Sequence, residues 1–407
     1  MKRSRWIGCA ILLSLAALGL AKSKPKTESL KPVGIRLYHF EVQGRTAPVA
    51  VWYPAARASD QPFAYNGQAK GTAYLEVEPD KSGAPYPLIV FSHGMGGCGY
   101  QSLYYVENLA RAGYIVASMD HKDAAMCVME GQPRITAGQI VGATLKSGGD
   151  LSTTVMLLFR DAISDFDFSY RPKDISGLID FALSLNHSDQ ALKGLLDPQK
   201  IGATGHSLGG LTTLMLAGAD YDCVDPKKWP EDSCNKSEEM MAHKNELKPG
   251  DFDLAELGSM SCCLANLKGK KTSFKDPRVS ASLALGPALF FPEGAFQAVK
   301  MPVMLITGSG NFEVPLEPIQ KAYDELSPPK YLLHLKGVDH MTITDVAYRM
   351  WYARLFLPGF RSRFHMKKAV YENFSANFFN AYLKGDQAGM EYISQKHYPL
   401  VELQAWK

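Results

Sequence analysis

This sequence has almost no excess of charge of either sign. Its 407 residues contain 44 Lys and Arg against 41 Asp and Glu. The small excess lies in residues 1–21, where Lys2, Arg3 and Arg5 stand without an acidic residue, and 44 − 3 leaves 41 basic against 41 acidic residues beyond them. A neutral chain lacks the basic surface that binds a phosphate backbone, so we expect no nucleic-acid partner.

Long apolar runs are also scarce. The run Trp6–Leu20 has 15 residues, which is too short to cross a bilayer comfortably. It follows a basic start and precedes small residues that end at Ala21, a pattern typical of a cleaved secretory signal. We therefore predict a signal peptide over residues 1–21 and an exported protein, periplasmic or secreted. An uncleaved anchor is the alternative.

Cysteine is sparse, and its spacing does not fit a metal site. Six cysteines lie beyond the predicted signal, and no two have the C-x-x-C spacing of zinc motifs, so we expect no metal. An even number in an exported chain favours disulfides, and we predict three of them. A bond between Cys98 and Cys127 would tie two loops at the functional edge of the sheet. The sequence leaves the complete pairing open.

One glycine-rich motif carries the predicted chemistry. Residues 205–210 read Gly-His-Ser-Leu-Gly-Gly, after a short apolar segment, 200–204, and before a helical pattern, 211–217. In this strand-turn-helix context G-x-S-x-G indicates a nucleophile elbow, in which the serine sits on a tight turn at a helix N-terminus. Ser207 is therefore the predicted nucleophile. The alternative is a turn serine that only caps the helix.

A second glycine-rich segment predicts the groups that would bind a developing oxyanion. The buried-strand pattern 87–91 leads into Ser92-His93-Gly94-Met95-Gly96-Gly97. A serine hydrolase uses the N–H after its nucleophile and one from the loop after the third strand, here Leu208 and Met95. We expect His93 to fix the loop by hydrogen bonding rather than to act as the base.

The predicted base lies near the C-terminal end of the chain. The pattern 331–335 predicts a last buried strand, and a short turn then leads to His340. This histidine follows Ser207 in chain order, as the serine, acid and histidine of α/β-hydrolases require. None of the nine other histidines stands in a turn after a late buried strand. A capping or turn histidine is the alternative interpretation.

These motifs together resemble a known family. The chain is similar to predicted dienelactone hydrolases, platelet-activating-factor acetylhydrolases and bacterial polyester hydrolases over about residues 34–400. The similarity is carried by motifs in the same order, namely Val51-Trp52-Tyr53-Pro54-Ala55, Phe91–Gly97, Asp120-His121-Lys122-Asp123, Arg171-Pro172-Lys173-Asp174, the elbow and Gly337-Val338-Asp339-His340. The resemblance implies an α/β-hydrolase fold and acyl-transfer chemistry, but this fold accepts many substrates.

The chain departs from the family at the acid of the triad. Many relatives carry an aspartate where this chain has Asn311, and the acetylhydrolases place it after the preceding strand, where this chain has Leu285-Gly286-Pro287. Asparagine can orient an imidazole but cannot balance its positive charge. Glu313 is the nearest substitute and our predicted acid. The position of Asn311, or a carboxylate from Asp220 or Asp222, stays open.

The expected architecture is a mostly parallel eight-stranded sheet flanked by helices, formed by residues 22–407 as a single domain. Long insertions near 123–170 and 219–276 would form walls or a lid over the pocket, or surface elaborations. Strands are expected at 35–41, 48–53, 87–92, 114–119, 200–204, 279–285, 302–307 and 331–335. Helices are expected near 101–112, 174–186, 207–218, 317–327, 341–356 and 370–384.

The function predicted from these features is cleavage of a carboxylic ester by an exported serine hydrolase through an acyl-enzyme, with no cofactor. The substrate would be a small-molecule or lipid-like ester. Basic and aromatic residues interleave over 349–368 and could give weak contact with a membrane surface. An amidase or acyltransferase on the same frame, or a non-catalytic binding protein with this fold, are the alternatives.

Overall fold

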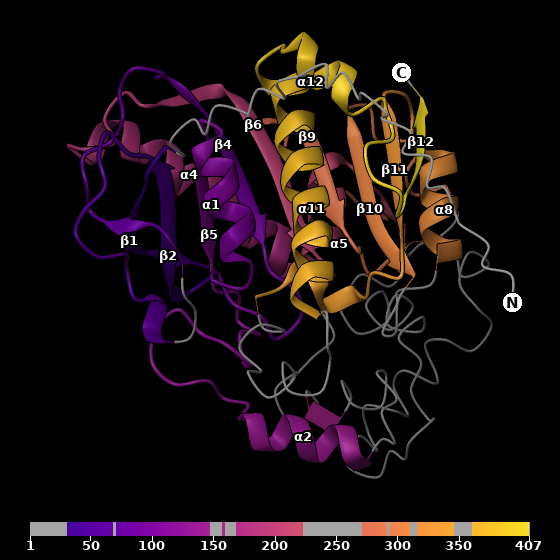
Figure 1. Cartoon of the computed structure of the whole chain (residues 1–407), viewed down its shortest axis with the longest axis horizontal. Helices are drawn as coiled ribbons and strands as arrows, with labels where there is room; N and C mark the ends of the chain where they lie inside the picture. Colours follow the sequence, from indigo (N-terminus) through magenta and orange to yellow (C-terminus); the bar gives the residue numbers. More distant parts are fainter. Residues whose placement is uncertain are drawn as a thin grey trace, which may run out of the picture. The chain divides into compact units, whose positions relative to one another are not determined.

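A large twisted sheet organises the unit Lys31–Lys407 (Figure 1). The computed structural model describes residues 31–67, 71–146, 157–158, 168–222, 271–289, 291, 294–309, 316–345 and 360–406. Within these residues a ten-stranded sheet has the order β12-β11-β10-β9-β6-β4-β5-β2-β1-β3. The strands are β1 Val33–Val42, β2 Arg45–Pro54, β3 Tyr74–Leu75, β4 Tyr86–Ser92, β5 Ile115–Met119, β6 Leu196–His206, β9 Val279–Leu285, β10 Val303–Ser309, β11 Lys330–Lys336 and β12 Val401–Trp406.

The six central strands run parallel, from β5 through β4, β6, β9 and β10 to β11. Strands β4 and β5 are buried at every residue, which explains their continuous apolar sequences. Antiparallel strands complete both sides, since β2 pairs with β5 and β12 pairs with β11. A separate two-stranded sheet joins β7, Tyr221–Asp222, to β8, Lys271–Thr272.

Helices cover both faces of this sheet (Figure 1). On one face α1, Leu103–Arg111, and α11, Phe360–Leu383, pack over a core that contains Ile89 and Phe91. On the other face α4, Tyr170–Ser188, packs against Leu88 and Val90, the alternate residues of β4. Helices α5, Leu208–Ala217, and α8, Leu316–Glu325, pack with β9 and β10 around a third cluster.

Four further helical segments are described. They are α2 Ala137–Lys146, α12 Gln387–Tyr392, the 3₁₀ turn η4 His340–Ile343 and the short 3₁₀ turn η1 Tyr65–Gly67. No helix among the described residues combines the length and the apolar character needed to span a membrane.

The predicted fold class is confirmed, and all eight expected strands are present. The sheet has two more strands than expected, because β3 adds two residues beside β1 and β12 adds an antiparallel edge to β11. The structure describes the first five residues of the expected helix 341–356, and they do not form an α-helix. The chain makes one 3₁₀ turn and leaves it at Thr344, which is extended with φ −92° and ψ 149°. Residues 346–359 lie outside the described residues.

Candidate active site

Ser207 occupies the turn between β6 and α5. Its backbone angles are φ 57° and ψ −118°, in a region that a residue with a Cβ rarely adopts. The turn is also tightly packed, because a Cβ built on Gly209 would lie 1.9 Å from the carbonyl oxygen of Ser92. Only glycine therefore lets α5 approach β4 so closely, and this approach holds Ser207 beside the loop that follows β4.

That loop, Ser92–Gly97, is called the glycine loop below. It reaches the elbow because β4 and β6 end in register, with Ser92 paired to Gly205. Three of its N–H groups are hydrogen-bonded: Gly94 donates to Gln101 Oε1 at 3.0 Å, Gly96 to Asp123 Oδ2 at 3.1 Å and Gly97 to Gly94 O at 3.0 Å.

Two N–H groups beside Ser207 are not used in this way. Neither the Met95 N–H nor the Leu208 N–H donates to any group in the described part of the chain. Leu208 begins α5, so its N–H has no partner within the helix. All ten residues of α5 are buried, and a helix N-terminus in such surroundings favours negative charge. The two N–H groups are thus available to a ligand oxygen.

A buried ion pair between Arg171 and Asp123 holds the glycine loop in place. Arg171 is fully buried and donates to Asp123 Oδ2 at 2.6 Å and to the carbonyl oxygen of His93 at 2.6 Å. Asp123 in turn accepts from Gly96 N–H and from the Tyr170 hydroxyl, at 2.7 Å. Burial alone would raise the pKa of Asp123, but the Arg171 charge holds that pKa well below its ordinary value.

A second buried network has the connectivity of a catalytic triad without its accessibility. Ser92 Oγ lies 2.9 Å from Nε2 of His121, and Nδ1 of the same ring lies 2.8 Å from Oδ2 of Asp174. Ser92 is only 1% exposed, and His121 and Asp174 are fully buried in their side chains. A substrate carbonyl cannot reach this serine, so we interpret the array as a structural network. His93 likewise stays structural, because its Nε2 accepts the His121 N–H at 3.0 Å.

His340 begins η4, just after the turn that follows β11. Asp339 caps this turn by accepting the Met341 N–H at 3.0 Å. The His340 ring packs on the ring of His206, with 4.5 Å between centroids, and a Cβ built on Gly286 would lie 3.0 Å from its Nδ1. Burial lowers the pKa of His340 to about 4, although the nearby Asp339 charge opposes this shift. The imidazole is therefore neutral at neutral pH and able to accept a proton.

The candidate acids lie mostly outside the described residues. This holds for Asn311, for Glu313 and for the side chain of Asp222. Asp220 forms an ion pair with Lys271 at 2.9 Å. Parts of both insertions and residues 349–359 of the predicted membrane-contact region are also outside the described residues.

The structure contains the predicted disulfide Cys98–Cys127, which closes a loop with a sequence separation of 29 residues. It joins the end of the glycine loop to the segment after β5, next to Asp123. The other four predicted disulfide cysteines lie within 223–270, outside the described residues. The described residues contain no group of three or more His, Cys, Asp or Glu that could hold a metal ion.

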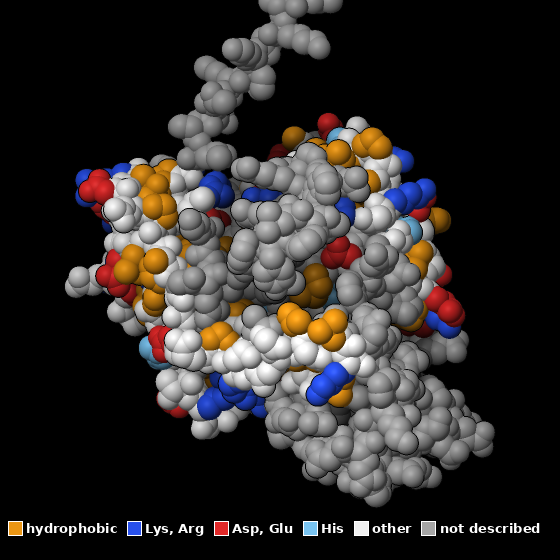
Figure 2. All heavy atoms as spheres, turned by 60° about the horizontal axis from the view of Figure 1, so that its bottom comes forward, with side chains coloured by type: hydrophobic (Ala, Val, Ile, Leu, Met, Phe, Trp, Pro, Cys, Tyr) orange, Lys and Arg blue, Asp and Glu red, His pale blue; other side chains and the backbone are white. Residues whose placement is uncertain are grey.

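Figure 2 shows apolar side chains exposed at the end of the molecule that lies at the bottom of Figure 1. Helix α2 contributes Val141 and Leu145, with Leu145 76% exposed.

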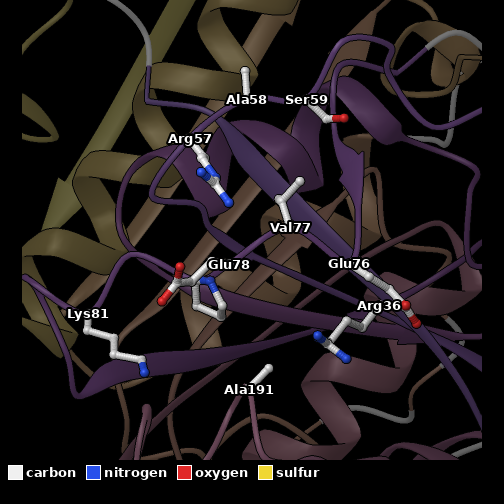
Figure 3. A pocket seen from close by; sticks show the side chains of 10 residues that line it. Arg36, Arg57, Ala58, Ser59, Glu76, Val77, Glu78, Lys81 and Ala191 are labelled. Atoms are coloured by element: carbon white, nitrogen blue, oxygen red, sulfur yellow. The ribbon is translucent and has the colours of Figure 1, made fainter.

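A cavity of about 650 Å³ lies elsewhere, between Lys81, which precedes β4, and Ala191, which precedes β6 (Figure 3). Since Ser207 follows β6, this cavity is at the opposite end of the strands. Charges of both signs line it, with Glu76 near Arg36.

The sheet order and the strand-turn-helix elbow define an α/β-hydrolase fold. A solved structure described as ferulic acid esterase from Streptomyces cinnamoneus has the same fold, with a TM-score of 0.56 and 20% identity, over 95% of this chain and 98% of that chain.

The chain is also related in sequence to the platelet-activating factor acetylhydrolases. The profile of the family described as platelet-activating factor acetylhydrolase, isoform II, matches residues 65–134. The acetylhydrolase of Cavia porcellus is 33% identical over 166 residues, 37% of this chain and 37% of that protein. That of Canis lupus familiaris is 27% identical over 161 residues, 35% of this chain and 34% of that protein. These matches span little more than a third of either relative.

Proposed function

We propose that this protein is a serine hydrolase that cleaves a carboxylic ester through an acyl-enzyme. His340 takes the proton of Ser207 as the hydroxyl attacks the ester carbonyl, and the N–H groups of Met95 and Leu208 receive the oxyanion. Protonated His340 then gives the proton to the leaving alcohol. A water molecule repeats the sequence on the acyl-enzyme and releases the acid.

The observation that carries this proposal is the surroundings of Ser207. A serine in a strained backbone conformation, at the N-terminus of a wholly buried helix, faces a loop in which only one of four successive N–H groups, from Gly94 to Gly97, has no partner among the described residues. Such strain persists where the surrounding structure imposes it, as at active sites. The names of the similar proteins, acetylhydrolase and esterase, support an ester as the substrate.

We infer that the triad acid comes from the segment after β10. Gly308 and Ser309 at the end of β10 contact the turn that leads to His340: the Gly337 N–H donates to Ser309 Oγ at 3.4 Å, and a Cβ built on Gly308 would lie 2.0 Å from the carbonyl oxygen of Val338. Glu313 follows this end of β10 by four residues and is a type of acid that this fold accepts.

Export is part of the same proposal. The N-terminal pattern is typical of a secretory signal, and a disulfide between buried cysteines persists in oxidising compartments. Cleavage before Lys22, determined by N-terminal sequencing of the secreted protein, would test it. A mature protein that still begins at Met1 would contradict it.

A fluorophosphonate probe tests the nucleophile. Wild-type protein should be labelled on Ser207 and should hydrolyse p-nitrophenyl esters, and Ser207→Ala should lose both properties while staying folded. Ser92→Ala is the matched control, because Ser92 also contacts a histidine that contacts an aspartate. It should keep the label. Labelling of Ser92, or labelling that survives Ser207→Ala, would overturn the assignment, and competition between water and added alcohol or amine would distinguish a hydrolase from a transferase.

A further inference from the structure

Gln101 connects parts of the site that lie far apart in sequence. It is 3% exposed and precedes α1, just beyond the disulfide cysteine Cys98. Its Oε1 accepts the Gly94 N–H at 3.0 Å, and its Nε2 lies 3.0 Å from Nδ1 of His206. On the other side of that ring, Nε2 of His206 lies 2.9 Å from the carbonyl oxygen of His340.

The chemistry of these groups allows only one direction for the chain of hydrogen bonds. The carbonyl oxygen of His340 can only accept, so Nε2 of His206 carries the proton and Nδ1 is the acceptor. The Gln101 amide therefore donates its N–H to Nδ1 and accepts the Gly94 N–H with its oxygen. Protonation of His206 would convert the acceptor into a donor and break this arrangement. Burial, and next the electrostatic interaction with the His340 ring, lower the pKa of His206 well below its ordinary value, in keeping with a neutral ring.

The fold leaves room for this amide at two glycines. A Cβ built on Gly97 would lie 2.1 Å from Gln101 Oε1, and one built on Gly94 would lie 3.3 Å from the same atom. The main chain of Gln101 joins the same regions, because its carbonyl oxygen accepts the Asp345 N–H at 2.8 Å. Gln101 thus contacts the glycine loop, the residue before Ser207 and the segment that begins at His340.

We propose that Gln101 is a positioning residue, whose side-chain amide sets the glycine loop against the His340 segment by way of His206. This inference rests on the proposed ester hydrolysis. The amide touches neither substrate nor reacting atoms. Its effect is on the direction of the adjacent Met95 N–H and on the placement of the imidazole, which matter most in the transition state.

Gln101→Met removes both side-chain hydrogen bonds and keeps the length of the side chain. Because removal of an oxyanion donor costs about 10²–10³ in kcat, a misdirected donor should cost less, about 10- to 100-fold in kcat with little change in KM. Gln320→Met is the matched control, since among the described residues the Gln320 amide bonds only Asp324 and Gln404, at the surface. It should leave kcat unchanged. A Gln101→Met variant that is folded and has wild-type kcat would overturn the proposal.

Gln101→Glu tests the direction of the chain in a variant of nearly identical shape. A carboxylate and the unprotonated Nδ1 of His206 are both acceptors. The hydrogen bond between the two side chains therefore persists only while they share one additional proton. Activity of this variant should approach wild type at low pH and fall as pH rises through the pKa of the pair, a loss that wild type does not show. A pH profile identical to that of wild type would count against Gln101 as the donor.

Gly97→Ala disturbs the Gln101 amide without a substitution at position 101. It displaces the Gln101 oxygen without changing Gln101 itself, so its effect on kcat should not add to that of Gln101→Met. Additive losses would contradict the proposal. The ¹⁵N shifts of the His206 ring separate this inference from the ester hydrolysis: they should show an unprotonated, hydrogen-bonded Nδ1 in wild type that changes in Gln101→Met. If wild type cleaves no ester, the proposed function fails, while the shifts still decide whether the link exists.

Discussion

Replacement of Arg171 by methionine should destabilise the protein strongly. The side chain is fully buried and donates to Asp123 and to the carbonyl oxygens of His93 and Gly94. Methionine fills much of the same space but leaves the Asp123 carboxylate without its counter-charge. Breaking a buried ion pair on one side costs about 3–5 kcal/mol, a large part of a typical stability of about 5–15 kcal/mol.

Denaturant unfolding measures this loss, and Arg278→Met provides the comparison. Arg278 also forms ion pairs, with Asp276 and Asp180, but its side chain is 31% exposed. We expect a cost of at most about 1 kcal/mol there, because solvent screens such pairs. The double variant Arg171→Met/Asp123→Asn should recover part of the lost stability, since no buried charge remains.

The pH dependence of stability identifies the cause of the loss. In wild type Arg171 holds the pKa of Asp123 low, so its contribution is complete above the unfolded pKa of about 3.9 and disappears as pH falls through the folded pKa. Without Arg171 the buried carboxyl takes up a proton in the native state, and its folded pKa rises above the unfolded value. Arg171→Met should therefore become more stable as pH is lowered from 8 towards 5. A loss below 1 kcal/mol without this trend would refute the reasoning.

Three further predictions concern the site. The value of kcat/KM should fall as pH is lowered through the pKa of His340, because the base must be neutral; burial lowers this pKa to about 4 and the charge of Glu313 in the proposed triad raises it again, so an inflection above pH 7 would contradict this. Cys98→Ser/Cys127→Ser should lose about 3–4 kcal/mol in thermal unfolding, from a loop with a separation of 29 residues, and a loss below 1 kcal/mol would disagree. Glu313→Gln should lower turnover by about four orders of magnitude and Asn311→Asp change it little, whereas the inverse result would assign the acid to position 311.

The central architecture was predictable because its signals are local. Strands β4 and β5 are continuous apolar segments, since both of their faces are covered. The turn at Ser207 needs glycine where α5 meets the backbone of β4, and this need appears in the sequence as a motif. Strand β12 was missed although Val401 and Leu403 alternate with polar residues, because one short alternation at a sheet edge is a weak signal.

The contacts between distant segments were not predictable in this way. Nothing near Gln101 indicates that its amide meets His206, since the two residues approach only after β4 and β6 pair and α1 packs on the sheet. The Ser92, His121 and Asp174 network likewise comes from three separate elements. Their residue types suit catalysis, and only burial distinguishes them from a working site.

The position of His340 bears on the acid that the family would supply. The resemblance to the acetylhydrolases implies an acid after the strand equivalent to β9, where this chain has Leu285-Gly286-Pro287. Here the imidazole occupies the space next to this glycine, because a Cβ on Gly286 would lie only 3.0 Å from Nδ1 of His340. An aspartate at this position would require a small shift of the ring, and the φ of 48° there strains any residue with a Cβ. Residues 285–287 contain no carboxylate. The end of β10, where Ser309 contacts Gly337, is adjacent to the turn that carries the histidine. This geometry is in keeping with Glu313 as the proposed source of the acid, and we infer that the resemblance to the acetylhydrolases does not extend to the third member of the triad.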